Sequence, residues 1–118
     1  MTLDGSWAAQ LSSKFIGVTD PLALAANGTH RFLAADILAE HLALRGDDRF
    51  SGSSVVLLKG TDFGKKSTVN GKTLWVTLAV GYFYDEQSVQ DFCQSAYPDK
   101  SGPALANVCM PRTLTPPH

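Results

Sequence analysis

Three uncharged side chains and one cation in this sequence have the chemistry of a binding surface. Gln10 and Thr77 can donate and accept hydrogen bonds, and Trp75 offers a flat apolar ring. Such a ring can lie against the C–H face of a sugar while polar neighbours hydrogen-bond the sugar hydroxyls. Arg112 adds a guanidinium group that can bind an anion. The first three side chains must share one face of the fold to act together. The alternative is that Trp75 is covered by one of the chain's own loops.

The pattern of residue types does not indicate a reaction. The sequence has no nucleophile elbow, no P-loop and no dinucleotide-binding fingerprint, because its glycines are scattered. The histidines, His30, His41 and His118, lack the paired ligands of a metal site. Asp36 and Glu40 predict only a charged helix face beside His41. We expect no catalysis, cofactor or metal, although a triad assembled in space has no signature of this kind.

Composition is typical of one globular domain. The chain has 118 residues, of which 44% are hydrophobic and 18% charged. Its net charge of −1 argues against a nucleic-acid partner. No stretch approaches the roughly 18 apolar residues of a membrane span, and the first residues do not resemble a signal peptide. The chain is therefore expected to be either cytosolic or a domain of a longer secreted or membrane-anchored protein.

Hydrophobic spacing and turn residues predict alternating strands and helices. The segment 30–45 is rich in alanine and leucine, with Thr29 as a plausible N-cap and Gly46 just past its end. A second helix is expected at 86–97, capped by Asp85. Strands are expected at 6–15, 55–59, 73–80 and 105–112. The middle two strands form a hairpin with a long connection that contains an Asn70-Gly71 turn.

The resulting order, β-α-β-β-α-β, predicts an α+β domain of the ferredoxin-like class. Such a domain has a four-stranded antiparallel sheet with both helices on one face, and its first and third strands are central. The other face is expected to be open, which antiparallel sheets tolerate. We expect one domain over residues 6–112 and an extended tail over 113–118.

Alternation along the two central strands predicts which side chains face the open side. Trp7, Ala9 and Leu11 are expected to point toward the helices. Apolar residues of the third strand are expected to do the same, namely Leu74, Val76, Leu78 and Val80. The open face would then carry Ala8, Gln10, Ser12, Trp75, Thr77 and Ala79. This arrangement brings the candidate binding residues of the two strands together.

Cys93 and Cys109 are the only cysteines in the sequence. Cys93 lies on the inner stripe of the predicted second helix, and Cys109 lies in the strand that follows it. Because these two elements pack together in a split βαβ unit, a disulfide is expected, and it would indicate an oxidising compartment. The alternative is two small buried hydrophobic side chains.

Two segments, WAAQLSS at 7–13 and WVTLAVGYFYDEQSV at 75–89, resemble the strand–helix repeat of the SPOR domain family. Gln10, Ser13 and Phe15 lie near the family's first motif, and Gly81 and Phe83 lie on its second. The resemblance implies a βαββαβ fold that binds peptidoglycan glycan strands through its open sheet face. The sequence departs from the family's motifs at Ser12, Thr77 and Tyr82.

Three functions remain as expectations. The first is an extracytoplasmic, non-catalytic module that binds peptidoglycan glycan through Gln10, Trp75, Thr77 and Arg112. The second is a protein-interaction or sensory domain of a cell-envelope signalling or division protein, which is favoured if the sheet face is closed. The third is an RNA-binding module, because RNA-recognition motifs share this element order. Its aromatic pattern and basic charge are missing here.

Overall fold

The computed structural model describes residues 3–64, 68–69 and 71–118. Within them, the four main strands are β1 (Ser6–Lys14), β4 (Ser54–Lys59), β7 (Trp75–Val80) and β8 (Met110–Leu114). The helices are α1 (Ala34–Arg45), α2 (Glu86–Ala96), α3 (Gly102–Ala106) and the short 3-10 helix η1 (Asp48–Phe50). Two short antiparallel pairs join β2 (Val18–Thr19) to β3 (Arg31–Phe32), and β5 (Thr68–Val69) to β6 (Lys72–Thr73).

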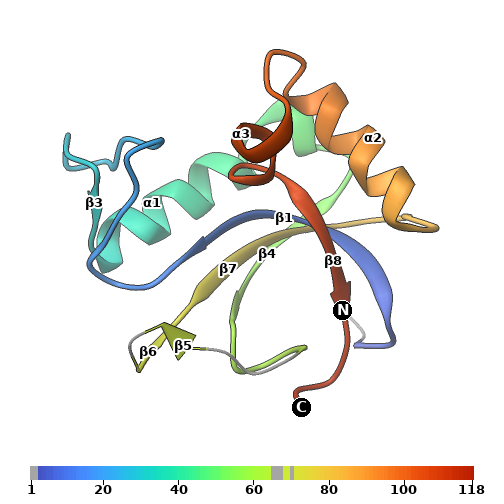
Figure 1. Ribbon diagram of the computed structural model, residues 1–118, viewed down its shortest axis with the longest axis horizontal. Helices are drawn as coiled ribbons and strands as arrows, with labels where there is room; N and C mark the ends of the chain where they lie inside the picture. The colour runs from blue at the N-terminus through green and yellow to red at the C-terminus, as the bar shows by residue number, and fades with distance from the viewer. Residues whose placement is uncertain (1–2, 65–67, 70) are drawn as a thin grey trace.

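The main strands form one antiparallel sheet in the order β4-β7-β1-β8. This confirms the prediction of an α+β domain whose first and third main strands are central. The helices lie on one side of the sheet, and β1 and β8 run side by side at one of its edges (Figure 1). A candidate site can therefore lie in the helix layer, on the helix-free face or along a sheet edge.

Strand β1 changes its orientation partway along its length. Ala9 and Leu11 are buried in the core beneath the helices, as predicted. A shift in the pairing with β7 then occurs between Gln10 and Ser12, which marks a β-bulge. Beyond it, Ser12 and Lys14 both reach Glu40 on α1. The prediction that Ser12 faces away from the helices is wrong, because the extra residue of the bulge reverses the alternation.

Strand β7 is oriented opposite to the prediction. Val76 and Leu78 pack on the helix-free face, in a cluster with Phe63 and Leu114. Ala79 belongs to the core beneath the helices, and Thr77 contacts α1. Both sides of this central strand are buried, so its apolar residues carry no period-two signal from which the orientation can be read.

The helix-free face of the sheet is covered at its centre by the chain itself. Phe63, from the connection that follows β4, is completely buried against β7 and β8. The neighbouring Gly64 has a φ of +61°, and its N–H donates to the carbonyl of Thr115 at 2.8 Å. A residue with a Cβ would be strained there. The predicted open platform is therefore closed by residues 60–64 and the chain's last residues.

Helix α1 begins later than the sequence predicts. Residues 31–32 pair with β2, so the helix starts at Ala34 and Thr29 does not cap it. The carboxylate of Asp36 instead accepts from the N–H of Leu33 at 2.8 Å and from the side chain of Asn27 at 2.8 Å. The turn residue Asn70 lies outside the described residues, although β5 and β6 pair on either side of it.

The C-terminal half confirms the second helix and corrects the last strand. Asp85 caps α2 by accepting from the N–H of Ser88 at 2.8 Å. Residues 102–106 form the helix α3, and β8 runs from Met110 to Leu114 rather than over 105–112. Cys93 on α2 and Cys109 just before β8 form a buried disulfide, as predicted. The covalent link attaches the helix layer to the edge strand β8.

Candidate functional site

The four predicted binding residues lie on two different sides of the sheet. Gln10 and Arg112 lie together on the helix-free face, where the guanidinium donates to the Gln10 amide oxygen at 2.7 Å. Arg112 also stacks over the ring of Phe63, with 4.7 Å from Cζ to the ring centroid. Its burial lowers the pKa of its guanidinium from the ordinary value. Through its contact with Phe63, Arg112 holds residues 60–64, which cover the helix-free face, against β8.

Trp75 and Thr77 lie on the opposite side, facing α1. Thr77 is 2% exposed, and its Oγ1 lies 3.3 Å from Nδ1 of His41. Thr77 is therefore not accessible to a ligand. The predicted cluster of Gln10, Trp75 and Thr77 is therefore not formed, because β7 presents the opposite side chains to the helix-free face.

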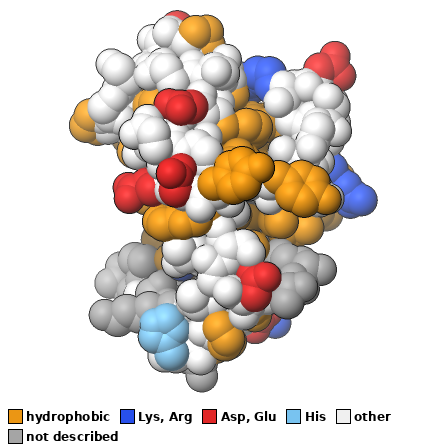
Figure 2. All heavy atoms as spheres, turned by 90° about the vertical axis from the view of Figure 1, so that its right-hand side faces the viewer, with side chains coloured by type: hydrophobic (Ala, Val, Ile, Leu, Met, Phe, Trp, Pro, Cys, Tyr) orange, Lys and Arg blue, Asp and Glu red, His pale blue; other side chains and the backbone are white. Residues whose placement is uncertain are grey.

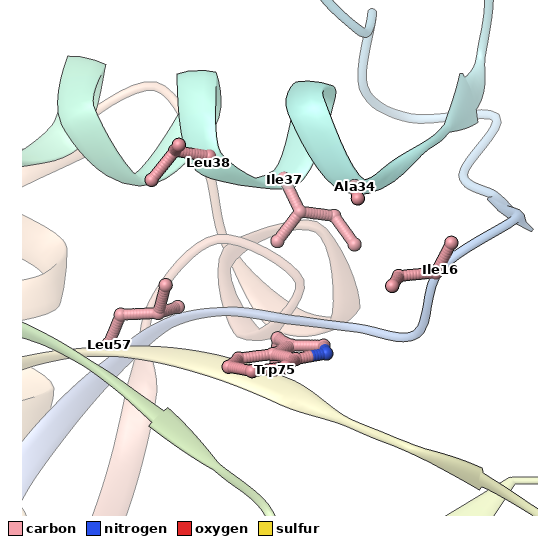
Figure 3. A pocket seen from close by; sticks show the side chains of 6 residues that line it. All are labelled: Ile16, Ala34, Ile37, Leu38, Leu57 and Trp75. Carbon is pink, nitrogen blue, oxygen red and sulfur yellow. The ribbon is translucent and has the colours of Figure 1, made fainter.

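Trp75 instead forms the floor of an apolar pocket beneath α1. The pocket has a volume of about 210 Å³. Its lining consists of Ile16, Ala34, Ile37, Leu38, Leu57 and Trp75. Figure 3 shows Ile37 of α1 directed toward the indole ring, with Ile16 on one side of the ring and Leu57 on the other. The indole nitrogen is the one polar side-chain atom of this lining, so the pocket suits an apolar side chain better than a sugar.

Helix α1 presents an apolar outer surface. Leu38 is 50% exposed and Leu42 is 53% exposed, and they are one turn apart. Asp36 and His41 of the same helix are buried. A surface helix normally has the reverse distribution, with charged residues outside and leucines inside. We name Ala35, Leu38 and Leu42 the α1 outer stripe; all three are exposed and apolar.

Glu40 of α1 is paired with two residues of β1. Lys14 Nζ lies 2.8 Å from Glu40 Oε1 and 3.0 Å from Ser12 Oγ. It also lies 3.8 Å from a carboxylate oxygen of Asp20. Ser12 donates to Glu40 as well. Every buried side-chain polar atom among the described residues has a partner, so this cluster stabilises the helix on the sheet.

A second exposed surface lies where β7 connects to α2. Tyr82 and Tyr84 are fully exposed, while Phe83 between them packs edge-on against Phe92 of α2 at 5.2 Å. Figure 2 views the side on which this connection lies and shows hydrophobic side chains there beside acidic ones. Phe83 is half-buried and its ring packs against α2, so the two tyrosines project from an anchored turn.

Metal and membrane chemistry find no support in the part of the chain that the structure describes. Within residues 3–64, 68–69 and 71–118, no group of three histidine, cysteine or acidic side chains is placed to hold a metal ion. None of the helices described there has both the length and the apolarity to cross a membrane.

The sequence predicted Trp75 as a candidate binding residue but indicated neither the pocket nor the α1 outer stripe. The available signal was the composition of α1, in which apolar residues are not confined to one side of the helix. The direction of Trp75 could not be read, since it depends on the orientation of β7.

Comparison of the chain with protein-family models, with curated proteins and with solved structures gives no match.

Proposed function

We propose that this chain is a non-catalytic binding domain that receives an apolar segment of a partner protein at the pocket beneath α1. The observation that carries the proposal is the continuity between the pocket and the exposed part of α1, since Leu38 belongs to both. Apolar surface that is exposed in one connected area is typical of protein-interaction sites. Trp75 is the expected anchor, because aromatic residues dominate the energetics of such sites.

The fold and compartment are part of the same proposal. The sheet order supports a ferredoxin-like domain. The Cys93–Cys109 disulfide supports an oxidising, extracytoplasmic location. Of the expected functions, an interaction or sensory domain of the cell envelope fits these features best, because the sheet face that would bind a glycan is covered by Phe63.

Selection of random displayed peptides on the immobilised chain tests this function. Enriched peptides should carry apolar side chains, and their synthetic forms should change the emission of Trp75 in a Trp7→Phe variant, which retains this single tryptophan. Leu38→Glu should abolish binding because it places a charge at the pocket rim. Leu24→Glu is the matched control, since Leu24 is exposed in a loop away from this pocket. Peptides that bind the wild type and Leu38→Glu equally would refute the proposal.

Glycan binding is a second candidate function, supported by the exposed Tyr82 and Tyr84. Their rings could stack on sugar units, while the sheet face could not. Co-sedimentation with purified peptidoglycan sacculi tests this candidate. A Tyr82→Ser/Tyr84→Ser variant should lose sedimentation and a Leu22→Ser variant should keep it. Equal sedimentation of both variants would show that the tyrosines do not bind the glycan.

A further inference from the structure

We propose that the apolar partner segment is strand β4 of a second copy of this chain. Two chains would then form a symmetric dimer through their β4 edges and α1 helices. This inference rests on the proposed function, because it names the segment that would bind at the side of the pocket lined by Leu38 and Leu57.

One edge of the sheet is protected and the other is not. The edge strand β8 contains Pro111, which has no N–H to donate. The edge strand β4 reads SVVLLK and pairs with β7 in an uninterrupted register, without a bulge or proline. No other strand among the described residues pairs with its outer side. An apolar edge of this kind is a template for pairing with another strand.

The hydrogen-bond pattern shows which groups of β4 are free to pair. The N–H of Gly60 donates to the carbonyl of Leu74, which places that residue pair in the ladder with β7. In an antiparallel ladder such pairs recur at every second residue. The backbone groups of Val56 and Leu58 therefore point to β7. Those of Val55, Leu57 and Lys59 point outward.

A two-fold axis perpendicular to the sheet places each side chain opposite one on the same face. If Leu57 lies on the axis, it pairs with Leu57 of the second copy, and Val55 pairs with Lys59 in both directions. Every outward-facing residue of β4 is then used, and each pair exchanges two hydrogen bonds. A register centred on Val56 would leave Lys59 without a partner in β4, so the Leu57 register is preferred.

The α1 outer stripe explains why a second copy fits better than a free peptide. Helix α1 packs on β4, the edge strand, on the same side of the sheet as the pocket. The same axis would bring the two α1 helices side by side and antiparallel, burying Leu38 and Leu42 of each copy. A single added peptide strand would lie in the plane of the sheet and leave Leu42 exposed.

Charge does not oppose the pairing. Lys59 is the one charged residue of β4. In the Leu57 register the two Lys59 residues are offset by four positions, roughly 13 Å along the strand. This exceeds the Debye length of about 8 Å at physiological ionic strength, so their repulsion is largely screened. The α1 outer stripe contains no charged residue.

Sedimentation velocity of the full chain over a concentration series tests the dimer. The wild type should sediment as a dimer, and Leu38→Glu or Leu42→Glu should raise the dissociation constant by about thirtyfold or more. Both leucines are half-exposed in the single chain, so these variants should still fold. Leu22→Glu, which alters a more exposed leucine in the connection between β2 and β3, should leave the dimer intact.

Amide hydrogen exchange followed by NMR tests the register without relying on a substitution in the edge. In the wild type at high concentration, the amides of Val55, Leu57 and Lys59 should be protected. In Leu38→Glu they should exchange rapidly. The amides of Val56 and Leu58 are the internal control, because β7 protects them in both proteins.

The outcomes separate this inference from the proposed function. A wild type that stays monomeric, with rapid exchange at Val55 and Leu57, overturns the dimer. If that monomer still binds the selected apolar peptides, the proposed function stands with another partner. A dimer that survives Leu38→Glu and leaves those amides unprotected forms through another face and also overturns the inference. A monomer that binds no apolar peptide overturns both.

Discussion

Thr77 Oγ1 lies 3.3 Å from His41 Nδ1, and this contact joins the centre of strand β7 to the middle of helix α1. Both residues are buried, so a polar pair lies within the layer between helix and sheet. It fixes the orientation of β7 with Thr77 and Trp75 toward the helix. The apolar pocket beneath α1 depends on that orientation.

The stability of the fold should fall as the pH drops below about 6.5 because of His41. Burial, and to a smaller extent the charge of Arg45, lowers the pKa of His41 from its ordinary value of 6.5. The unfolded chain then binds a proton near pH 6.5 while the folded chain does not, so protonation favours unfolding. The loss should continue until the pH reaches the lowered pKa of the folded state.

Urea unfolding at pH 7.5 and 5.5 measures this effect. The difference between the two pH values should shrink in His41→Gln. It should persist in His30→Gln, because His30 is exposed. Equal pH dependence in the wild type and His41→Gln would contradict the assignment.

Removal of the disulfide should destabilise the domain without changing its topology. The bond joins residues 16 positions apart. Closing a loop of about this length is worth around 3 kcal/mol in the chain-entropy model. A Cys93→Ala/Cys109→Ala variant should lose at least that much free energy of unfolding. A reducing agent should destabilise the wild type and have no effect on the variant; an equal effect on both would count against the bond.

Phe63→Ala should be among the most destabilising substitutions. Phe63, in the connection that follows β4, is completely buried against the sheet. Truncation of a buried phenylalanine costs about 3–5 kcal/mol. Tyr82→Ala, at a fully exposed aromatic residue, should change stability by less than about 0.5 kcal/mol. A Phe63→Ala variant as stable as Tyr82→Ala would show that the connection does not cover the sheet in solution.

Lys14→Met should destabilise the fold more than the double change Lys14→Met/Glu40→Met. The single change leaves the half-buried carboxylate of Glu40 without its cation, at a cost of up to about 3 kcal/mol after allowing for its partial exposure. The double change removes both charges. Arg49→Met is the surface control, because the Arg49–Asp47 pair is more exposed and should be worth at most about 1 kcal/mol. Chemical denaturation of the four proteins gives the comparison, and equal losses from the single and double changes would refute a buried ion pair.

Local signals predicted the elements that local interactions specify. The cap of α2 depends on Asp85 and Ser88, which are neighbours in sequence. The disulfide could be anticipated because a helix and its following strand pack together, although a third helix lies between Cys93 and β8. The start of α1 was misplaced, because the β2–β3 pairing takes residues that would otherwise extend the helix.

The candidate site could not be located in the same way, because its position depends on tertiary context. The bulge after Gln10 and the burial of both faces of β7 each change which side chains face the helices. The folding of Phe63 back over the sheet leaves no periodic pattern in the sequence. Trp75 was identified by its chemistry, and its surroundings were set by these long-range contacts.

The position of the disulfide also determines how the domain responds to tension on its two ends. Ser6 pairs with Leu114, so the first and last strands meet at the same end of an antiparallel pair. Pulling on the ends would peel β8 from β1 one residue pair at a time. A sheet resists this less than shear, because the hydrogen bonds break singly rather than together. Peeling can proceed from Leu114 only as far as Cys109, where the load passes through the sulfurs to α2. Residues 94–108 are bypassed, so the α3 segment is shielded from extension even after the edge strand has detached.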